Sequence, residues 1–298
     1  MFANVSFAAI QAAIRPTLRA LSIYKMREGV TTPSFLSALQ HVPLLETLIL
    51  IDACPYVLSP AQKLLEPRKV VTLPCLRWVQ IVSIGSTLVN LLKYLSFTAI
   101  TAVHLRLREL HSLEETTPEN LGEFFASKFT SNPRRMALND TKSTLNLTTW
   151  TESGTSSSIR IASSDSLRIN IIIGSMTSGL ITANLFNLYV CITLTHHMVL
   201  LDAGIYEAMF AKAHNLQYLR LSSIDRVPSI LRGHQEGDSG GSERLSLPSL
   251  LNLTVDKIQE TDASILVEIL KNRKEWGDGR KYISSLSGTW PLLDLQDN

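Results

Sequence analysis

The sequence predicts an α/β protein built as an irregular leucine-rich-repeat solenoid, with a curved parallel sheet and outer helices, over residues 1–298 as a single domain. Three observations predict this fold. The form LxxLxL recurs along the chain, apolar stripes at helical spacing separate several of its copies, and 45% of the residues are hydrophobic while 18% are charged. One strand unit cannot bury its own apolar face, whereas stacked units share a continuous core.

The strand pattern predicts which side chains face the core. Side chains alternate between the two faces of a strand, so the last two apolar positions of each copy point inwards. Parallel strands then need a crossover, which is usually helical. The copies occupy residues 18–23, 45–50, 76–81, 100–105, 216–221 and 250–255. The first four start 27, 31 and 24 residues apart and the last two start 34 apart, so the units are long and irregular compared with common leucine-rich repeats of roughly 20 to 29 residues.

Apolar stripes predict the helices of these crossovers. Thr32 and Pro33 open the first of them, because a capping residue followed by proline is typical of a helix start. Thr117 and Pro118 open the second. The four expected stripes are Phe35, Leu36, Leu39 and Val42; Leu88, Leu91, Leu92 and Leu95; Leu121, Phe124, Phe125 and Phe129; and Ile265, Leu266, Ile269 and Leu270.

Three segments depart from the repeat. Residues 1–17 are expected to form an N-terminal helix or cap. Residues 1–27 contain four basic and no acidic residues, which faintly resembles a mitochondrial presequence. Residues 131–166 form an irregular middle, with short strand-like runs over 145–150 and 158–162, and with a third over 167–173. Residues 232–246 are rich in glycine, serine and charge, which predicts a flexible loop.

Charge and cysteine content narrow the function classes. The net charge of +2 gives no reason to expect a nucleic-acid partner. The three cysteines, Cys54, Cys75 and Cys191, form no CxxC pair, so neither a disulfide framework nor a zinc module is predicted. We expect no small-molecule cofactor and a cytoplasmic or nuclear location.

A membrane-associated protein is the first alternative. Residues 169–201 contain no Asp, Glu, Lys or Arg, and a bilayer span needs about 20 mostly apolar residues. Polar residues such as Asn170, Asn184 and Asn187 interrupt this run, and LFNLYVCITL has the composition of a buried strand. Core strands separated by a loop are therefore the favoured interpretation of this segment.

Two motifs suggest other chemistry. The segment GDSGG surrounds Ser239, as around the nucleophile of chymotrypsin-like proteases, so a serine hydrolase is a remote alternative. No histidine lies in a matching context, and the composition of residues 233–243 is that of a solvated loop. His196 and His197, with Asp202, could suggest a metal, but adjacent strand side chains point to opposite faces and rarely share one ion. We expect neither an enzyme nor a metal site.

The repeats carry a resemblance to a known family. The units VPLLETLILIDA and AHNLQYLRLSSI, with the closing segment ILVEILKNRKEWGDGRKYISSLSG, resemble the repeat region of fungal F-box-like leucine-rich repeat proteins, particularly those of basidiomycetes, over residues 16–288. The resemblance implies a substrate receptor of a cullin-type ubiquitin ligase, in which an F-box binds the ligase adaptor and the repeats recruit a protein substrate. We recognise no F-box, and residues 1–17 are shorter than such a motif.

Strand alternation also predicts a protein-binding face. The strand positions between the core residues should form the concave surface of the solenoid, where Trp, Tyr and Arg side chains contribute most to binding. The predicted binding residues are Tyr24, Trp78, Gln80, His104, Arg106, Arg108, Tyr218, Arg220, Asn252 and Thr254.

Overall fold

The computed structural model describes residues 1–55, 70–98, 101–108, 118–128, 133–141, 144–162, 171–172, 174–176, 187–192, 210, 213–222, 249–256, 264, 266 and 285–287. The protein is α/β, with mixed but mostly parallel strand pairing. Its contacts group the chain into two compact units. Unit 1 comprises Met1–Thr117, Lys128–Thr130 and Thr155–Asp165, and unit 2 comprises Pro118–Ser127, Ser131–Gly154 and Ser166–Asn298.

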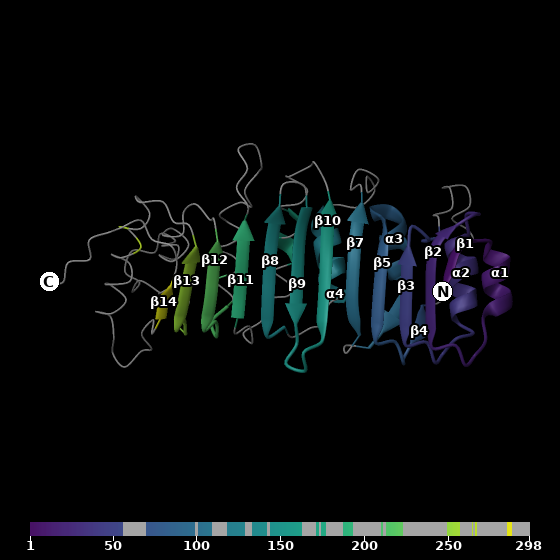
Figure 1. Cartoon of the computed structure of the whole chain (residues 1–298), viewed down its shortest axis with the longest axis horizontal. Helices are drawn as coiled ribbons and strands as arrows, with labels where there is room; N and C mark the ends of the chain where they lie inside the picture. Colours follow the sequence, from purple (N-terminus) through teal and green to yellow (C-terminus); the bar gives the residue numbers. More distant parts are fainter. Residues whose placement is uncertain are drawn as a thin grey trace. The chain divides into compact units, whose positions relative to one another are not determined.

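Unit 1 contains a wholly parallel run of strands (Figure 1). In their order across the sheet they are β1 (Phe2–Val5), β2 (Ala20–Met26), β3 (Thr47–Ile51), β5 (Trp78–Ile84), β7 (Ala102–Arg108) and β10 (Ser156–Ala162). The helices are α1 (Phe7–Ala13), α2 (Thr32–Leu39) and α3 (Gly85–Lys93), with α2 and α3 behind the strands in Figure 1. A separate parallel pair joins β4 (Val71–Leu73) to β6 (Leu95–Phe97).

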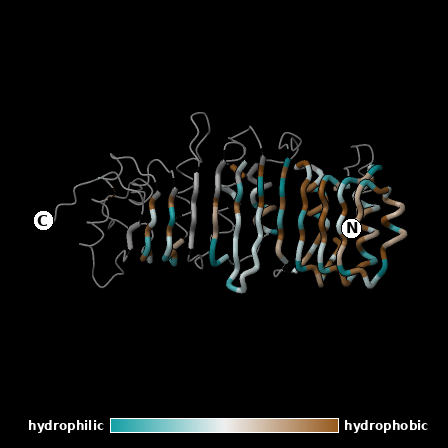
Figure 2. Tube along the Cα trace, viewed as in Figure 1, coloured by the Kyte–Doolittle hydropathy of each residue, from teal (hydrophilic) through white to brown (hydrophobic). Residues whose placement is uncertain are grey.

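The core of unit 1 lies between its strands and its helices. The strand side chains that point inwards alternate with more exposed ones, as Figure 2 shows in the banding of hydropathy along these strands. The inward row through the middle of the sheet consists of Ile23, Leu50, Ile81, Leu105 and Ile159, all of which are at most 2% exposed. Helices α2 and α3 supply buried residues that include Phe35, Leu36, Leu88 and Leu91.

Three strands of unit 1 share a backbone feature. Ala3, Tyr24 and Ile51 are register partners on β1, β2 and β3. Each is followed by a non-glycine residue in the left-handed region, namely Asn4 (φ 52°), Lys25 (φ 59°) and Asp52 (φ 51°). This conformation is uncommon for residues with a Cβ. Its recurrence at one register position shows that these strands repeat one another in backbone geometry.

Unit 2 combines a hairpin with parallel strands. β8 (Arg135–Thr141) pairs antiparallel with β9 (Thr144–Trp150). On its other side β8 pairs parallel with β11 (Asn187–Ile192), and the parallel order continues through β12 (Tyr218–Ser222), β13 (Asn252–Asp256) and β14 (Ser285–Ser287). The opposed arrows of β8 and β9 mark the hairpin in Figure 1.

Helix α4 (Pro118–Lys128) buries Phe125 in unit 2 and approaches residues 171–176 closely. A Cβ at Gly122 would lie 2.5 Å from both the carbonyl oxygen of Ile172 and the Cβ of Ser175. Glycine is therefore required at this position by the close approach of the two backbones.

The predicted strands and helices are largely confirmed, with specific corrections. All six LxxLxL copies lie at strands, as do the runs 145–150 and 158–162. Residues 1–17 hold a strand as well as a helix, because Phe2–Val5 pairs with β2. Ile171 and Ile172 are helical, so the expected strand over 167–173 was wrong there. Leu95 lies in β6 rather than in α3.

One helix start also needs correction. The cap of α2 is Thr31, whose side-chain oxygen accepts a hydrogen bond from the backbone N–H of Ser34 at 3.4 Å. Thr32 is already helical. The loop predicted at 232–246 and most of the stripe from Ile265 to Leu270 lie outside the described residues; Leu266 is described, helical and buried.

Candidate binding face

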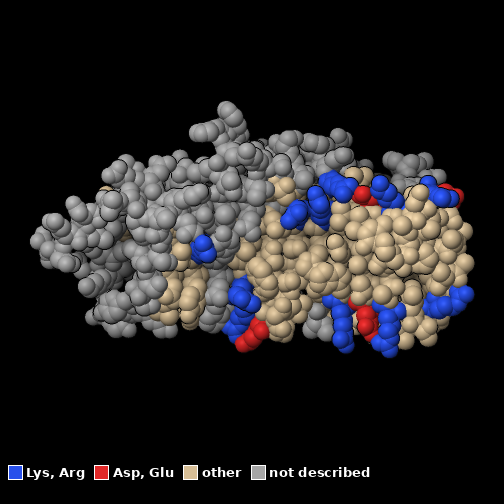
Figure 3. Space-filling view, in the orientation of Figure 1, with Lys and Arg blue, Asp and Glu red and all other residues tan. Residues whose placement is uncertain are grey.

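The sheet of unit 1 has one face that points away from its buried core. We call this surface the open face, and it lies towards the reader in Figure 3. Its side chains alternate with the core residues along each strand. It contains Ser22, Tyr24, Thr47, Ile49, Ile51, Trp78, Gln80, Val82, Ile84, His104, Arg106, Arg108, Ser158 and Arg160.

Trp78 and His104 form an aromatic contact on the open face. Their ring centroids are 4.2 Å apart with an interplanar angle of 32°. The register partner of Trp78 on β7 is Ala102, whose small side chain leaves room for the indole to reach the imidazole two residues further along. Trp78 remains 38% exposed. The contact therefore holds a large aromatic surface in one orientation while leaving part of it accessible.

The imidazole of His104 is held from the neighbouring strand. Its Nδ1 lies 2.9 Å from Oγ of Ser158, whereas the buried Nε2 has no hydrogen-bond partner among the described residues. Burial lowers the pKa of His104 below its usual 6.5. The ring is consequently neutral at pH 7.

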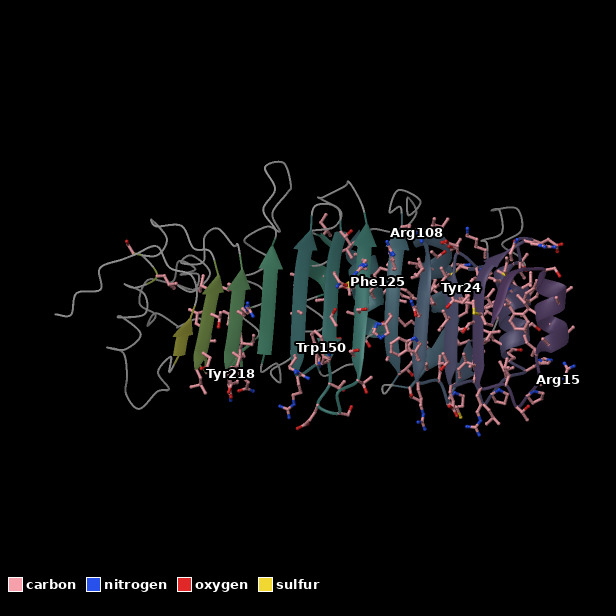
Figure 4. All side chains as sticks on the ribbon, viewed as in Figure 1. Arg15, Tyr24, Arg108, Phe125, Trp150 and Tyr218 are labelled. Carbon is pink, nitrogen blue, oxygen red and sulfur yellow. The ribbon has the colours of Figure 1, made fainter. Side chains whose placement is uncertain are left out.

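The arginines of the open face lie on β7 and β10. Arg106 and Arg160 are register partners, and both are exposed. Arg108 is two residues further along β7, and its Nη1 donates to both carboxylate oxygens of Asp52, at 2.8 and 3.0 Å. Figure 3 shows Lys and Arg side chains along this margin of the face, and Figure 4 labels Arg108 there.

An apolar region adjoins the arginines. Ile49 and Ile51 on β3 are partly exposed, Val82 on β5 is 7% exposed, and Ile84 at the end of β5 is 39% exposed. Val82 is the register partner of both Ile51 and Arg106. The open face thus changes from apolar over β3 and β5 to cationic over β7 and β10.

The other predicted binding residues lie together in unit 2. Tyr218 and Asn252 are register partners on β12 and β13, as are Arg220 and Thr254. Tyr218 is 49% exposed. Tyr24, Trp78, Gln80, His104, Arg106 and Arg108 lie in unit 1, so the structure groups the predicted residues into two sets.

Four surface residues were not predicted from the sequence. Ser158 and Arg160 belong to the open face because β10 is the neighbour of β7. In unit 2 the guanidinium of Arg135 lies 5.9 Å from the ring centroid of Trp150, its register partner across the hairpin. Alternation in SSSIRIA could have shown that Arg160 points away from the core, but no sequence signal places β10 beside β7.

Cys54, two residues after Asp52, has an unreactive thiol. Burial raises the pKa of its thiol to about 12; the nearby charge of Asp52 adds to this, and a hydrogen bond with Ser83 opposes it. Because the thiolate is the nucleophile, Cys54 is inert at neutral pH.

The alternative sites fall mainly outside the described residues. Ser239 with residues 233–243 lies there, as do His196, His197 and Asp202. Within the described residues, no three His, Cys, Asp or Glu side chains lie close enough together to hold a metal ion.

The run 169–201 is described in part. Residues 187–192 within it form strand β11. Of the helices that the structure describes, none has the length and apolar character that crossing a membrane would require.

Comparison with family models, with curated proteins and with solved structures found no match to this chain.

Proposed function

We propose that this chain is a non-enzymatic protein-recognition scaffold whose strand units form an irregular leucine-rich solenoid. The pairing of consecutive strand units supports the solenoid. β2, β3, β5 and β7 are consecutive LxxLxL copies, and each pairs in parallel with the next. The left-handed residues Asn4, Lys25 and Asp52, which follow register partners, repeat the backbone geometry as well.

The open face carries the functional part of the proposal. A partner protein docks on it, with Trp78 as the central aromatic contact and Arg106 and Arg108 at its side. Partly exposed Trp, Tyr and Arg side chains are those that most often contribute about 2 kcal/mol or more to a protein interface. Trp78 is also oriented by His104 before any partner arrives, which reduces the entropy lost on binding.

By resemblance, we propose that this scaffold is the substrate-recognition part of an F-box-type ubiquitin ligase, acting in the cytoplasm or the nucleus. Its partners would be a protein substrate and the adaptor of a cullin-type ligase. The units quoted above, VPLLETLILIDA and AHNLQYLRLSSI, support this proposal, and both lie at parallel strands.

Affinity purification of the tagged chain from its own cells, followed by mass spectrometry, tests both the recognition function and the ligase assignment. Adaptor and cullin subunits in the eluate are expected if the ligase assignment holds. Specific proteins without those subunits would leave a recognition scaffold and remove the ligase assignment. The double variant Trp78→Ala with Arg106→Ala should capture less of the same partners at an unchanged circular dichroism spectrum. Equal capture by a folded double variant would reject the open face as the docking site.

A further inference from the structure

Arg106 and Arg160 form an unusual pair of like charges. They lie directly opposite each other on adjacent parallel strands, about 4.8 Å apart in backbone spacing. Like charges directly opposite destabilise a sheet. Neither guanidinium has a hydrogen bond or ion pair among the residues that the structure describes, and both are exposed. This pair weakens the sheet, and no described residue neutralises its charge. The pair therefore indicates a surface that binds an anionic ligand.

Arg108, unlike Arg106 and Arg160, has an acidic partner. It projects from the same strand and the same face as Arg106, two residues along. Its Nη1 donates to both oxygens of Asp52, so its charge is balanced within unit 1. Of the three arginines on this part of the open face, the structure pairs one with an acid and leaves the facing pair available.

The register partners of Arg106 and Arg160 on the other strands indicate how a ligand would be oriented. Register partners run from Tyr24 to Ile51, Val82, Arg106 and Arg160 across β2, β3, β5, β7 and β10. The row therefore begins with aromatic and aliphatic side chains and ends with two cations. A complementary ligand carries apolar groups at one end and negative charge at the other, a few ångströms away. A nucleic acid would present its negative charge along its whole length.

We propose that the open face binds a linear acidic segment of a partner protein, in which aliphatic or aromatic side chains adjoin Asp or Glu. The apolar side chains lie over Ile51 and Val82, and a carboxylate is held between Arg106 and Arg160. Arginine suits this role because its planar guanidinium binds carboxylates in a fixed fork geometry. This proposal rests on the proposed recognition function and specifies its partner.

Selection from a random-peptide display library on the full-length chain tests the proposal. Enriched peptides should contain Asp or Glu next to aliphatic or aromatic residues. The best peptide, made synthetically, should bind the double variant Arg106→Gln with Arg160→Gln about tenfold more weakly or worse, since hydrogen bonds to charged groups are among the stronger ones. Its affinity should also fall as NaCl rises from 50 to 300 mM, because exposed charges are screened.

Arg77→Gln is a control for the loss of a positive charge outside the pair. Arg77 is an exposed arginine of unit 1 that precedes β5 and lies outside the open face, so this variant changes the net charge without touching the pair. It should bind the peptide with wild-type affinity. The same double and control variants are titrated with a 20-nucleotide oligothymidylate, which should bind weakly and without dependence on Arg106 or Arg160.

Three other results would contradict the acidic-segment proposal in different ways. Enriched peptides that lack acidic residues, yet need Trp78, would overturn the acidic specificity and leave the recognition face standing. Oligothymidylate binding that is tighter than peptide binding and lost in the double variant would overturn the proposal in favour of a nucleic acid. Failure to enrich any peptide would reject a linear ligand, while the recognition function would still be decided by the capture experiment on the tagged chain.

Discussion

One pair of arginines in unit 1 differs from the arginines of the hairpin in unit 2. In unit 1, Arg106 and Arg160 face each other across two parallel strands. In the hairpin of unit 2, Arg135 lies over the ring of Trp150, and Arg134 is 3.3 Å from a carboxylate oxygen of Glu152. The hairpin places partners beside its cations, as sequences under selection for stability commonly do. The facing pair in unit 1 therefore departs from the pairing seen at Arg134 and Arg135 in the hairpin and at Arg108 in unit 1 itself.

Replacing a tryptophan in each unit should give the largest difference in partner binding. Trp78→Ala removes the exposed ring that His104 orients and should weaken capture of a partner by about 2 kcal/mol, a value common for aromatic interface residues. Trp150→Ala in unit 2 is the matched change and should leave binding at the open face unaltered. Titration of both variants with the same labelled peptide measures this. Equal losses in the two variants would mean that the open face of unit 1 has no special role.

Reversing one charge should stabilise unit 1. Arg160→Glu turns the repulsion from Arg106 into an attraction across adjacent strands, and the free energy of unfolding should rise by about 1 kcal/mol. The corresponding change in unit 2, Arg134→Glu, removes an attraction to Glu152 and should not stabilise. Urea denaturation followed by circular dichroism compares the two. If Arg160→Glu is neutral or destabilising, the two guanidinium groups do not repel each other in the folded protein.

Removing the carboxylate that pairs with Arg108 should change the free energy of unfolding less. Asp52→Asn keeps a residue that tolerates the left-handed backbone but deletes the ion pair with Arg108. Both side chains are partly exposed, so solvent screening limits the loss to about 0.5 kcal/mol of unfolding free energy. Glu152→Gln, at a carboxylate that is 82% exposed, should change almost nothing. Because Asp52→Asn also frees a third arginine, it should increase the affinity for an acidic peptide. Unchanged affinity would show that Arg108 lies outside the path of the ligand.

The smallest expected effect is a dependence on pH. The pKa of His104 is lowered in the folded chain, so as pH falls below about 6.5 the unfolded state binds the proton first. The neighbours of the imidazole on the open face are Trp78, Gln80, Ser158 and the cation Arg106, and none of them is acidic. The free energy of unfolding should therefore decrease from pH 7 to pH 5.

His104→Gln isolates this contribution. Glutamine keeps a hydrogen-bonding group opposite Ser158 but does not titrate. The unfolding free energy of wild type minus that of the variant should decrease as the pH is lowered from 7 to 5, since only wild type loses stability through this residue. Parallel curves for the two proteins over that range would contradict the lowered pKa.

Strands and their facing directions could be predicted well from sequence. The copies of LxxLxL contain the alternation that separates Leu48 and Leu50 in the core from Thr47, Ile49 and Ile51 on the open face. This succeeds because burial of apolar side chains on one face is enough to set the orientation of a strand. The start of the first crossover helix was also placed to within a residue, because Pro33 and the stripe that begins at Phe35 are local signals. Its end was not, since the predicted stripe includes Val42 and the helix ends at Leu39.

The place of β10 in the sheet could not be predicted. β10 lies beside β7 although β8 and β9 come between them in the chain, and this step brings Arg160 opposite Arg106. Strand order depends on the path of the intervening residues and on the packing of the whole sheet, neither of which has a local pattern. Phe2–Val5 was missed for a related reason, since a four-residue edge strand is defined by its pairing with β2 rather than by its own sequence.

The left-handed residues after Ala3, Tyr24 and Ile51 have a consequence for engineering. A lysine at that conformation costs roughly 1 kcal/mol relative to glycine, and asparagine is among the residues that accept it most readily. A consensus strand unit for artificial arrays of this fold should therefore carry asparagine or glycine at the position of Lys25. The chain itself already contains one such unit at Asn4, which makes its first strand the natural template from which to copy.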